Sequence, residues 1–229
     1  MATFTGQLLI TTDNEIRFSI EAHQLAVTSL EWLSPTSIIS ASLDGTVVMH
    51  LLKANSLERQ CSLTIRVSDL PRKIRKSNAS SRPTGITSLC VIDDTVLVAS
   101  ETGAIWSVGL PDLTRLMTIA CEMEGIERLM YCSPYLLVIT PSAKAKLLTQ
   151  DGQRVRVLEW GLQMACCEPT GGLLFCGNNE EIICCDIRND AQQSTHYNIP
   201  TIMFAIDNEK QLINVDQTFN VNIYKLIYE

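Results

Sequence analysis

Three histidines and a few paired carboxylates are the residues best able to do acid–base chemistry. The histidines are His23, His50 and His196. His196 lies in a polar connection with no serine or cysteine predicted beside it, and Asp93-Asp94 and Glu180-Glu181 fall in or beside turns, where solvated acids are usual. No nucleophile, base and orienting group can be assembled from these positions. We predict a protein that is not an enzyme and has no cofactor.

Cysteine offers a second kind of chemistry, because thiolates bind zinc and form disulfides. The nine cysteines lie at positions 61, 90, 121, 132, 166, 167, 176, 184 and 185. No C-x-x-C spacing occurs, and most of them fall on predicted strands, where reduced cysteine is a small buried hydrophobe. An odd count without a signal peptide favours a reducing compartment. We therefore expect free thiols, no metal site and an intracellular protein, cytoplasmic or nuclear or both.

The strands that position these residues are predicted most clearly between Ala22 and Leu52. An alternating run, Val27 to Trp32, ends at Ser34-Pro35; a second run covers 37–42, and a third covers 46–52. Asp44-Gly45 separates the last two runs and supplies the positive φ angles of a tight hairpin turn. The segment predicts three consecutive antiparallel strands.

The same order of strands recurs along the chain. Positions equivalent to His50 in the third strand recur at Val108, Leu148, Cys185 and Tyr224, and the last three intervals are close to the period of a propeller blade, about 40 residues. The first interval is longer and contains an insertion. We predict an all-β propeller of five to six blades.

This pattern resembles the WD-repeat β-propeller family, with Ala22-His23 in place of its Gly-His and His50-Leu51 in place of its Trp-Asp. The resemblance spans nearly all of the chain, although recognisable family residues occur only in the first repeat and at its Cys185-to-Arg188 counterpart. It implies structural roles at His23, Ser40, Asp44, Gly45, His50 and Asp186. By the same resemblance, His23 bonds with Ser40 and Asp44, and His50 replaces the tryptophan of that network.

The two ends of the chain allow two readings. Residues 7–11 and 16–21 predict a strand pair before the first repeat, whereas the C-terminal repeat has only three predicted strands. In WD-repeat propellers an N-terminal strand usually completes the last blade, so 16–21 is one candidate for its fourth strand. Alternatively the N-terminal pair is a separate half-blade, and the propeller is open or completed by a partner, because an exposed edge invites pairing.

Charge and hydropathy restrict the classes of partner. A net charge of −7 argues against nucleic acid as a direct ligand of the whole protein. Apolar runs are no longer than a strand, so we expect no membrane insertion. With 46% hydrophobic residues, the chain can bury the core of one domain, 1–229.

One segment, at about 66–84, reverses the charge. It contains Arg72, Lys73, Arg75 and Lys76 among serines and prolines, and we interpret it as a flexible inter-blade loop. It is either a solvated loop or a docking segment for an acidic partner, for phosphates or for phosphorylation control. RNA binding is possible only through residues 66–82.

These observations favour a non-catalytic interaction scaffold in a stable hetero-complex, such as a coat, nuclear-pore, RNA-processing or trafficking assembly. Apolar residues near blade ends support that role: Leu51, Tyr224, Ile227 and Tyr228. The alternative is a substrate receptor or peptide reader. Asp186 and Arg188 lie where some propellers carry the Trp-Asp-x-Arg ending that docks on a ubiquitin-ligase adaptor.

Overall fold

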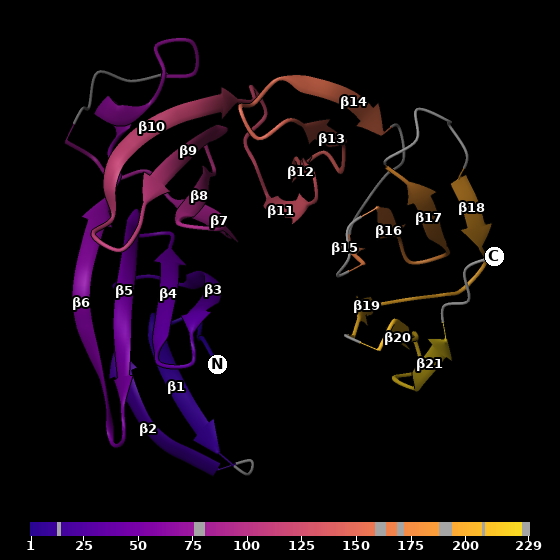
Figure 1. The fold of residues 1–229 in the computed structure, drawn as a ribbon, viewed down its shortest axis with the longest axis horizontal. Coiled ribbons are helices and arrows are strands. Elements are labelled where there is room, and N and C mark those ends of the chain that lie inside the picture. Colours follow the sequence, from indigo (N-terminus) through magenta and orange to yellow (C-terminus); the bar gives the residue numbers. More distant parts are fainter. Residues whose placement is uncertain are drawn as a thin grey trace. The chain divides into compact units, whose positions relative to one another are not determined.

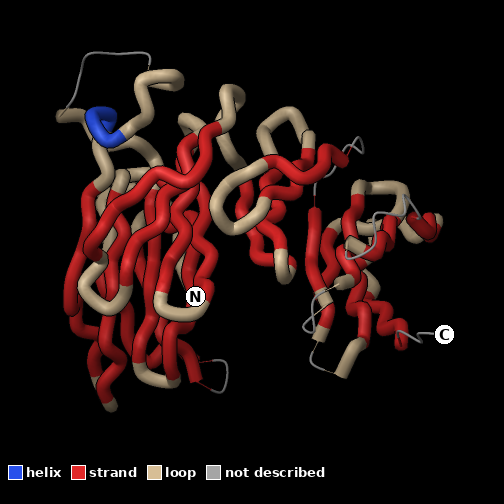
Figure 2. Tube along the Cα trace, turned by 45° about the horizontal axis from the view of Figure 1, so that its top comes forward, coloured by secondary structure: helices blue, strands red, loops and turns tan. Residues whose placement is uncertain are grey.

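A computed structural model describes residues 1–12, 15–75, 81–158, 164–168, 172–187, 194–207 and 209–225. These residues form antiparallel β-sheets, with one short 3₁₀ helix, η1 (Val67–Asp69). Figure 2 shows how far strands dominate the chain. The chain divides into two compact units, residues 1–129 and 130–229. The prediction of an all-β, propeller-type fold is confirmed, with five blade-type sheets among the described residues.

The first unit contains two four-stranded sheets, which we call blades 1 and 2 (Figure 1). Each is a meander in which consecutive strands pair. Blade 1 consists of β3 (Val27–Ser34), β4 (Ser37–Ser42), β5 (Thr46–Lys53) and β6 (Ser56–Thr64). Blade 2 consists of β7 (Ile86–Ile92), β8 (Thr95–Ser100), β9 (Ala104–Gly109) and β10 (Thr114–Cys121).

The second unit contains blades 3 to 5, although β11 already begins two residues before it. Blade 3 consists of β11 (Arg128–Cys132), β12 (Tyr135–Ile139), β13 (Ala145–Leu148) and β14 (Arg154–Leu158). Blade 4 consists of β15 (Met164–Cys167), β16 (Leu173–Gly177), β17 (Ile182–Asp186) and β18 (Ser194–Tyr197). Blade 5 has three described strands, β19 (Met203–Ile206), β20 (Gln211–Val215) and β21 (Val221–Lys225).

Neighbouring blades pack face to face through the middle strands of each sheet. Between blades 1 and 2, Ile39 and Val47 meet Ile86, Val98 and Trp106, all at most 1% exposed. Side chains alternate between the two faces along β4, β5, β8 and β9, so every second side chain points toward the neighbouring sheet. The same arrangement joins blades 3 and 4 through Leu137, Leu147, Leu174, Cys176 and Cys185. Each unit therefore has a core of its own.

The N-terminal strands β1 (Gln7–Thr12) and β2 (Glu15–Glu21) form a separate two-stranded sheet. Leu8, Ile10, Phe18 and Ile20 pack on the face of blade 1 that carries Ile38 and Leu57. β2 pairs with β1 in antiparallel register. The apolar side chains of the pair are buried on blade 1, and closure of the last blade by residues 16–21 stays a prediction. The alternative, a half-blade of its own, agrees with the sheet order.

The basic segment is anchored at both of its described ends. Leu70 and Ile74 are 4% and 5% exposed and belong to the core between blades 1 and 2. The indole Nε1 of Trp106 donates to the carbonyl oxygen of Asp69 over 3.4 Å, and Arg66 forms an antiparallel bridge with Pro83. Two apolar side chains among the charges thus pack the segment against the core of blades 1 and 2. The flexibility expected of this inter-blade loop stays a prediction.

Among the described residues, no helix has the length and apolarity needed to cross a membrane. The description of residues 1–229 as a single domain stays a prediction.

Candidate functional site

Blade 1 contains a buried polar chain that joins four of the residues singled out in the sequence. His23 Nδ1 lies 2.7 Å from Thr46 Oγ1, and His23 Nε2 lies 2.8 Å from Ser40 Oγ. Ser40 Oγ lies 3.1 Å from His50 Nε2. At the other end, the Asp44 carboxylate accepts the N–H of Thr46 over 2.8 Å and the Thr46 hydroxyl over 2.5 Å. The structure therefore brings His23, Ser40, Asp44 and His50 together.

The direction of the hydrogen bonds follows from Asp44. An ionised carboxylate only accepts, so the Thr46 hydroxyl donates to it and accepts from His23 Nδ1–H. His23 Nε2 then accepts from the Ser40 hydroxyl, and Ser40 accepts from His50 Nε2–H. Protons thus point in one direction from His50 to Asp44. His50 Nδ1 is left as a buried acceptor without a hydrogen-bond partner.

Burial and hydrogen bonds determine the protonation states of His23, His50 and Asp44 in this polar network. Burial lowers the pKa of His50 to about 4, and the positive charges of Arg59 and of a protonated His23 act in the same direction. Burial also lowers the pKa of His23, although Asp44 acts in the opposite sense. For Asp44, burial would raise the pKa, but hydrogen bonds from Thr46 and from the Gln24 N–H outweigh it and hold the pKa below its ordinary value. His23 and His50 are therefore neutral and Asp44 is ionised at neutral pH.

Ser40, His23 and Asp44 are the residue types of a catalytic triad, but Ser40 and His23 are buried. Ser40 is 0% exposed, so a substrate cannot reach its hydroxyl. His23 Nδ1 lies 3.6 Å from Asp44 Oδ2, and the Thr46 hydroxyl bonds to both residues. Gly45, between β4 and β5, has φ +82°, and a Cβ at this position would lie 2.7 Å from the Cβ of Pro83. The network therefore ties β4, β5 and the segment before β3 together.

The other predicted residues lie apart from this network. Arg72 and Lys73 are exposed, and Arg75 Nη1 donates to the Ser68 carbonyl over 3.4 Å. Asp186 is half-buried at the end of β17. Lys76, Arg188, Ile227 and Tyr228 lie outside the described residues. The ligase-adaptor hypothesis, which needs both Asp186 and Arg188, stays a prediction.

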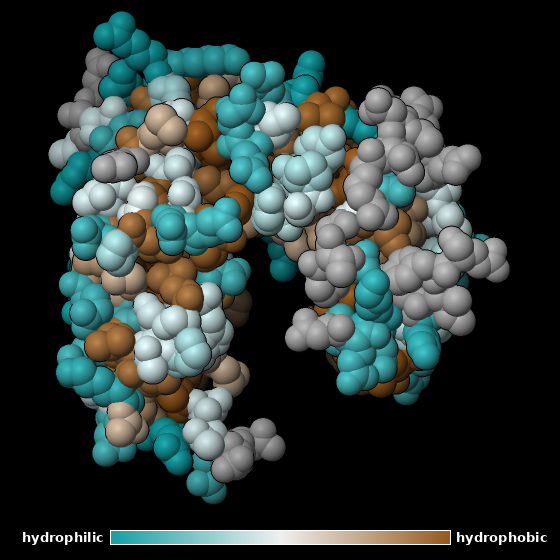
Figure 3. All heavy atoms as spheres, viewed as in Figure 1, coloured by the Kyte–Doolittle hydropathy of each residue, from teal (hydrophilic) through white to brown (hydrophobic). Residues whose placement is uncertain are grey.

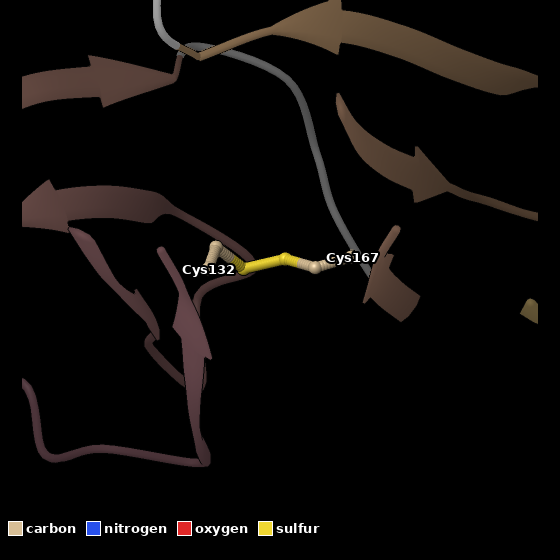
Figure 4. The surroundings of a disulfide bond; sticks show 2 residues. All are labelled: Cys132 and Cys167. Atoms are coloured by element: carbon tan, nitrogen blue, oxygen red, sulfur yellow. A yellow bond between two sulfur atoms is a disulfide. The ribbon is translucent and has the colours of Figure 1, made fainter. Parts of the chain in front are cut away.

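Two cysteines differ from the expected free thiols. Cys132 of β11 and Cys167 of β15 form a disulfide, with their Cα atoms 5.6 Å apart (Figure 4). The expectation of nine reduced cysteines is wrong for this pair, because the packing of blade 3 on blade 4 brings together two strand ends that are 35 residues apart in sequence. Free thiols are found at Cys61, Cys121, Cys176, Cys184 and Cys185. Intracellular localisation stays a prediction.

No group of three or more histidine, cysteine or carboxylate side chains that could hold a metal ion occurs in the described part of the chain. His196, the remaining histidine, binds Glu181 Oε2 through Nδ1 over 2.8 Å at the surface of blade 4. This contact joins β18 to the residue before β17, at the surface of blade 4.

Blade 5 presents an apolar face that the sequence reading did not single out. Register places Met203, Val215 and Val221 in one row and Ala205, Ile213 and Ile223 in the next, all on one face. We call these six residues the blade-5 apolar face. Met203, Val221 and Ile223 are 61%, 64% and 62% exposed, and Figure 3 shows hydrophobic residues at the surface near β20 and β21, at the lower right. The opposite face packs Phe204, Ile206 and Leu212 on blade 4.

A small cleft lies beside η1 in the first unit. Its volume is about 210 Å³. We call it the η1 cleft, and its lining consists of Val67, Leu70, Ile74, Glu101, Thr102, Met123, Glu124 and Gly125. Sequence alone could not reveal it, because its residues come from the basic segment, the β8–β9 turn and the β10–β11 connection.

Comparison with protein-family models and with curated proteins finds no match for this chain. The WD-repeat resemblance therefore stays at the level of the blade architecture.

Proposed function

We propose that the protein is a non-catalytic interaction scaffold, a WD-repeat-like propeller that works as a subunit of a stable hetero-complex inside the cell. The observation that carries the proposal is the blade-5 apolar face. Propeller-type folds commonly mediate protein interactions, because they present loops and sheet edges to several partners on a rigid frame.

The energetic argument concerns apolar area left in water. In blades 1 and 4, both apolar faces are covered by a neighbouring sheet. Met203, Val221 and Ile223 instead expose more than half of their surface. Covering apolar surface contributes about 25 cal/mol per Å², so a protein partner seated on this face gains affinity mainly from these side chains. We propose a partner with an apolar surface of matching size.

The edge of blade 5 supports the same proposal. Blades 1 to 4 have four strands each, whereas β21 is the last described strand of blade 5 and pairs on one side with β20. Unpaired backbone groups of an edge strand can accept a further strand. An extended segment of the partner is therefore expected to pair with β21 while its apolar side chains cover Val221 and Ile223.

The test combines light scattering with co-purification of the tagged full chain from its own cells. We expect one partner at constant stoichiometry, lost in Ile223→Glu, because a carboxylate would be buried in the contact. Val155→Glu is the matched control, since Val155 is also an exposed strand valine, 45% exposed on β14. Retention of the partner by Ile223→Glu, or its loss in both variants, would contradict docking at blade 5.

A further inference from the structure

The basic segment at 66–84 concentrates positive charge in an acidic protein. It contains six of the 18 lysines and arginines but only one of the 25 acidic residues, Asp69. The Asp69 carboxylate is used within the segment, since Oδ2 accepts the Arg66 backbone N–H over 2.7 Å and Oδ1 accepts the Ser68 hydroxyl over 3.4 Å. Five of the six cations are described, and among the described residues none of them forms an ion pair: Arg66, Arg72, Lys73, Arg75 and Arg82.

Backbone contacts bring two of these cations together from the two ends of the segment. The Val67 N–H donates to the Arg82 carbonyl over 2.8 Å, and Arg66 forms an antiparallel bridge with Pro83. Arg66 Nη1 also donates to the Ser81 carbonyl over 2.8 Å. Arg66 and Arg82, both exposed, therefore lie on neighbouring stretches of backbone although they are far apart in the sequence.

The other three cations lie on the turn at 71–75. Ile74 is 5% exposed and packs in the core, whereas Arg72 and Lys73 are exposed. Arg75 Nη1 donates to the Ser68 carbonyl over 3.4 Å, which draws this turn toward the paired ends of the segment. The fold thus gathers five like charges on one surface of the first unit. Their mutual repulsion is relieved when an anionic partner binds.

The spread of the charges favours a run of carboxylates over a single phosphate group. Arg66 and Arg75 each direct an N–H to a different backbone carbonyl, and Arg72 and Lys73 lie on a separate turn. A phosphate group is best bound by donors that converge on it. An extended acidic segment can instead meet the cations one after another. Between positions 66 and 84 there is no aromatic residue on which a nucleic-acid base could stack.

We propose that the basic segment docks an acidic segment, rich in aspartate and glutamate, of a partner protein. A guanidinium has five N–H donors, so Arg66 and Arg75 can bind a carboxylate while one N–H stays on its backbone carbonyl. Exposed ion pairs are weak one at a time, so affinity comes from several pairs formed together. The inference does not depend on docking at blade 5, since all of these residues belong to the first unit.

The test titrates the isotope-labelled full chain with an octaglutamate peptide and follows backbone amide resonances by NMR. We expect saturable shifts at Ser68, Arg72 and Arg82. Raising NaCl from about 50 mM to about 500 mM should weaken binding at least about tenfold, because salt screens exposed charges. Absence of shifts, or shifts only outside the basic segment, overturns the proposal.

Variants separate this surface from general attraction to any cation of the chain. Arg72→Glu with Lys73→Glu should weaken octaglutamate binding at least about tenfold, because two attractions become repulsions. Arg17→Glu with Arg154→Glu is the matched control, since it changes the net charge equally at exposed strand positions outside the segment. An equal loss of affinity in both double variants overturns the proposal. Unchanged thermal unfolding of each variant shows that the fold is retained.

A second probe distinguishes an acidic protein segment from a nucleic acid. Octauridylate carries a similar number of negative charges, together with bases that need aromatic partners for stacking. We expect it to bind the full chain no more tightly than octaglutamate does, under the same salt conditions. Tighter binding of octauridylate would overturn the proposal in favour of an RNA ligand.

Discussion

At the scale of single residues, His50 makes stability depend on pH. Its folded-state pKa is about 4, whereas an unfolded chain has the ordinary value near 6.5. As pH falls, the unfolded state takes up the proton first, so the free energy of unfolding drops between about pH 6.5 and pH 4. For one buried histidine the loss approaches about 3 kcal/mol. Denaturant titrations at several pH values measure it.

The variant His50→Gln isolates this contribution. Glutamine retains an N–H for the Ser40 hydroxyl but does not titrate, so the decline below pH 6.5 should become shallower. His196→Gln is the control, because His196 lies exposed on β18 and its loss should leave the decline in place. A His50→Gln profile as steep as that of the natural chain would show that other groups cause the acid sensitivity.

At the scale of elements, Ile74 should anchor the basic segment to blade 2. Ile74 is 5% exposed within the core, so Ile74→Ala should lower the free energy of unfolding by about 2–4 kcal/mol through lost burial and a cavity. Arg72→Ala, on the exposed side of the same segment, should change it by less than about 0.5 kcal/mol. Equal effects of the two substitutions would mean that the segment is not fastened by its apolar side chains.

The disulfide acts between elements, because it joins β11 of blade 3 to β15 of blade 4. Its two cysteines are 35 residues apart, and closing a loop of that length stabilises by about 3–4 kcal/mol in the chain-entropy account. We expect reductant to lower the free energy of unfolding of the natural chain. The double variant Cys132→Ser with Cys167→Ser should not respond, whereas Cys121→Ser, whose thiol is free, should respond fully. A natural chain that is insensitive to reductant would contradict the prediction.

Inner strands were more predictable than the rest. The runs at 37–42 and 46–52 agree with β4 and β5, because their alternating apolar residues are buried and the Asp44-Gly45 turn separates them. Outer strands such as β6, with its exposed Glu58, Arg59 and Gln60, lack a continuous apolar signal and were not delimited. Leu70 and Ile74 stand among charged residues in the sequence, so no apolar run marks them as core. The Cys132–Cys167 bond depends on which blades are neighbours, which spacing alone does not show.

At the scale of the whole molecule, the polar chain of blade 1 and the apolar face of blade 5 behave oppositely. The first is buried, and its hydrogen bonds join β4, β5 and the segment before β3. We expect that altering the second costs the isolated protein little stability, because Met203, Val221 and Ile223 are already exposed to water. An exposed apolar patch that folding does not require is typical of a surface that binds a partner.

This contrast gives the last prediction, which concerns solubility. Ile223→Lys should change the free energy of unfolding by less than about 0.5 kcal/mol, since Ile223 is 62% exposed, and should reduce self-association in light scattering. Leu212→Ala, on the opposite face of blade 5 at 4% exposure, should instead cost about 2–4 kcal/mol. A large loss of stability in Ile223→Lys would mean that the blade-5 apolar face is already covered within the folded chain, and it would remove the basis for a partner at that face.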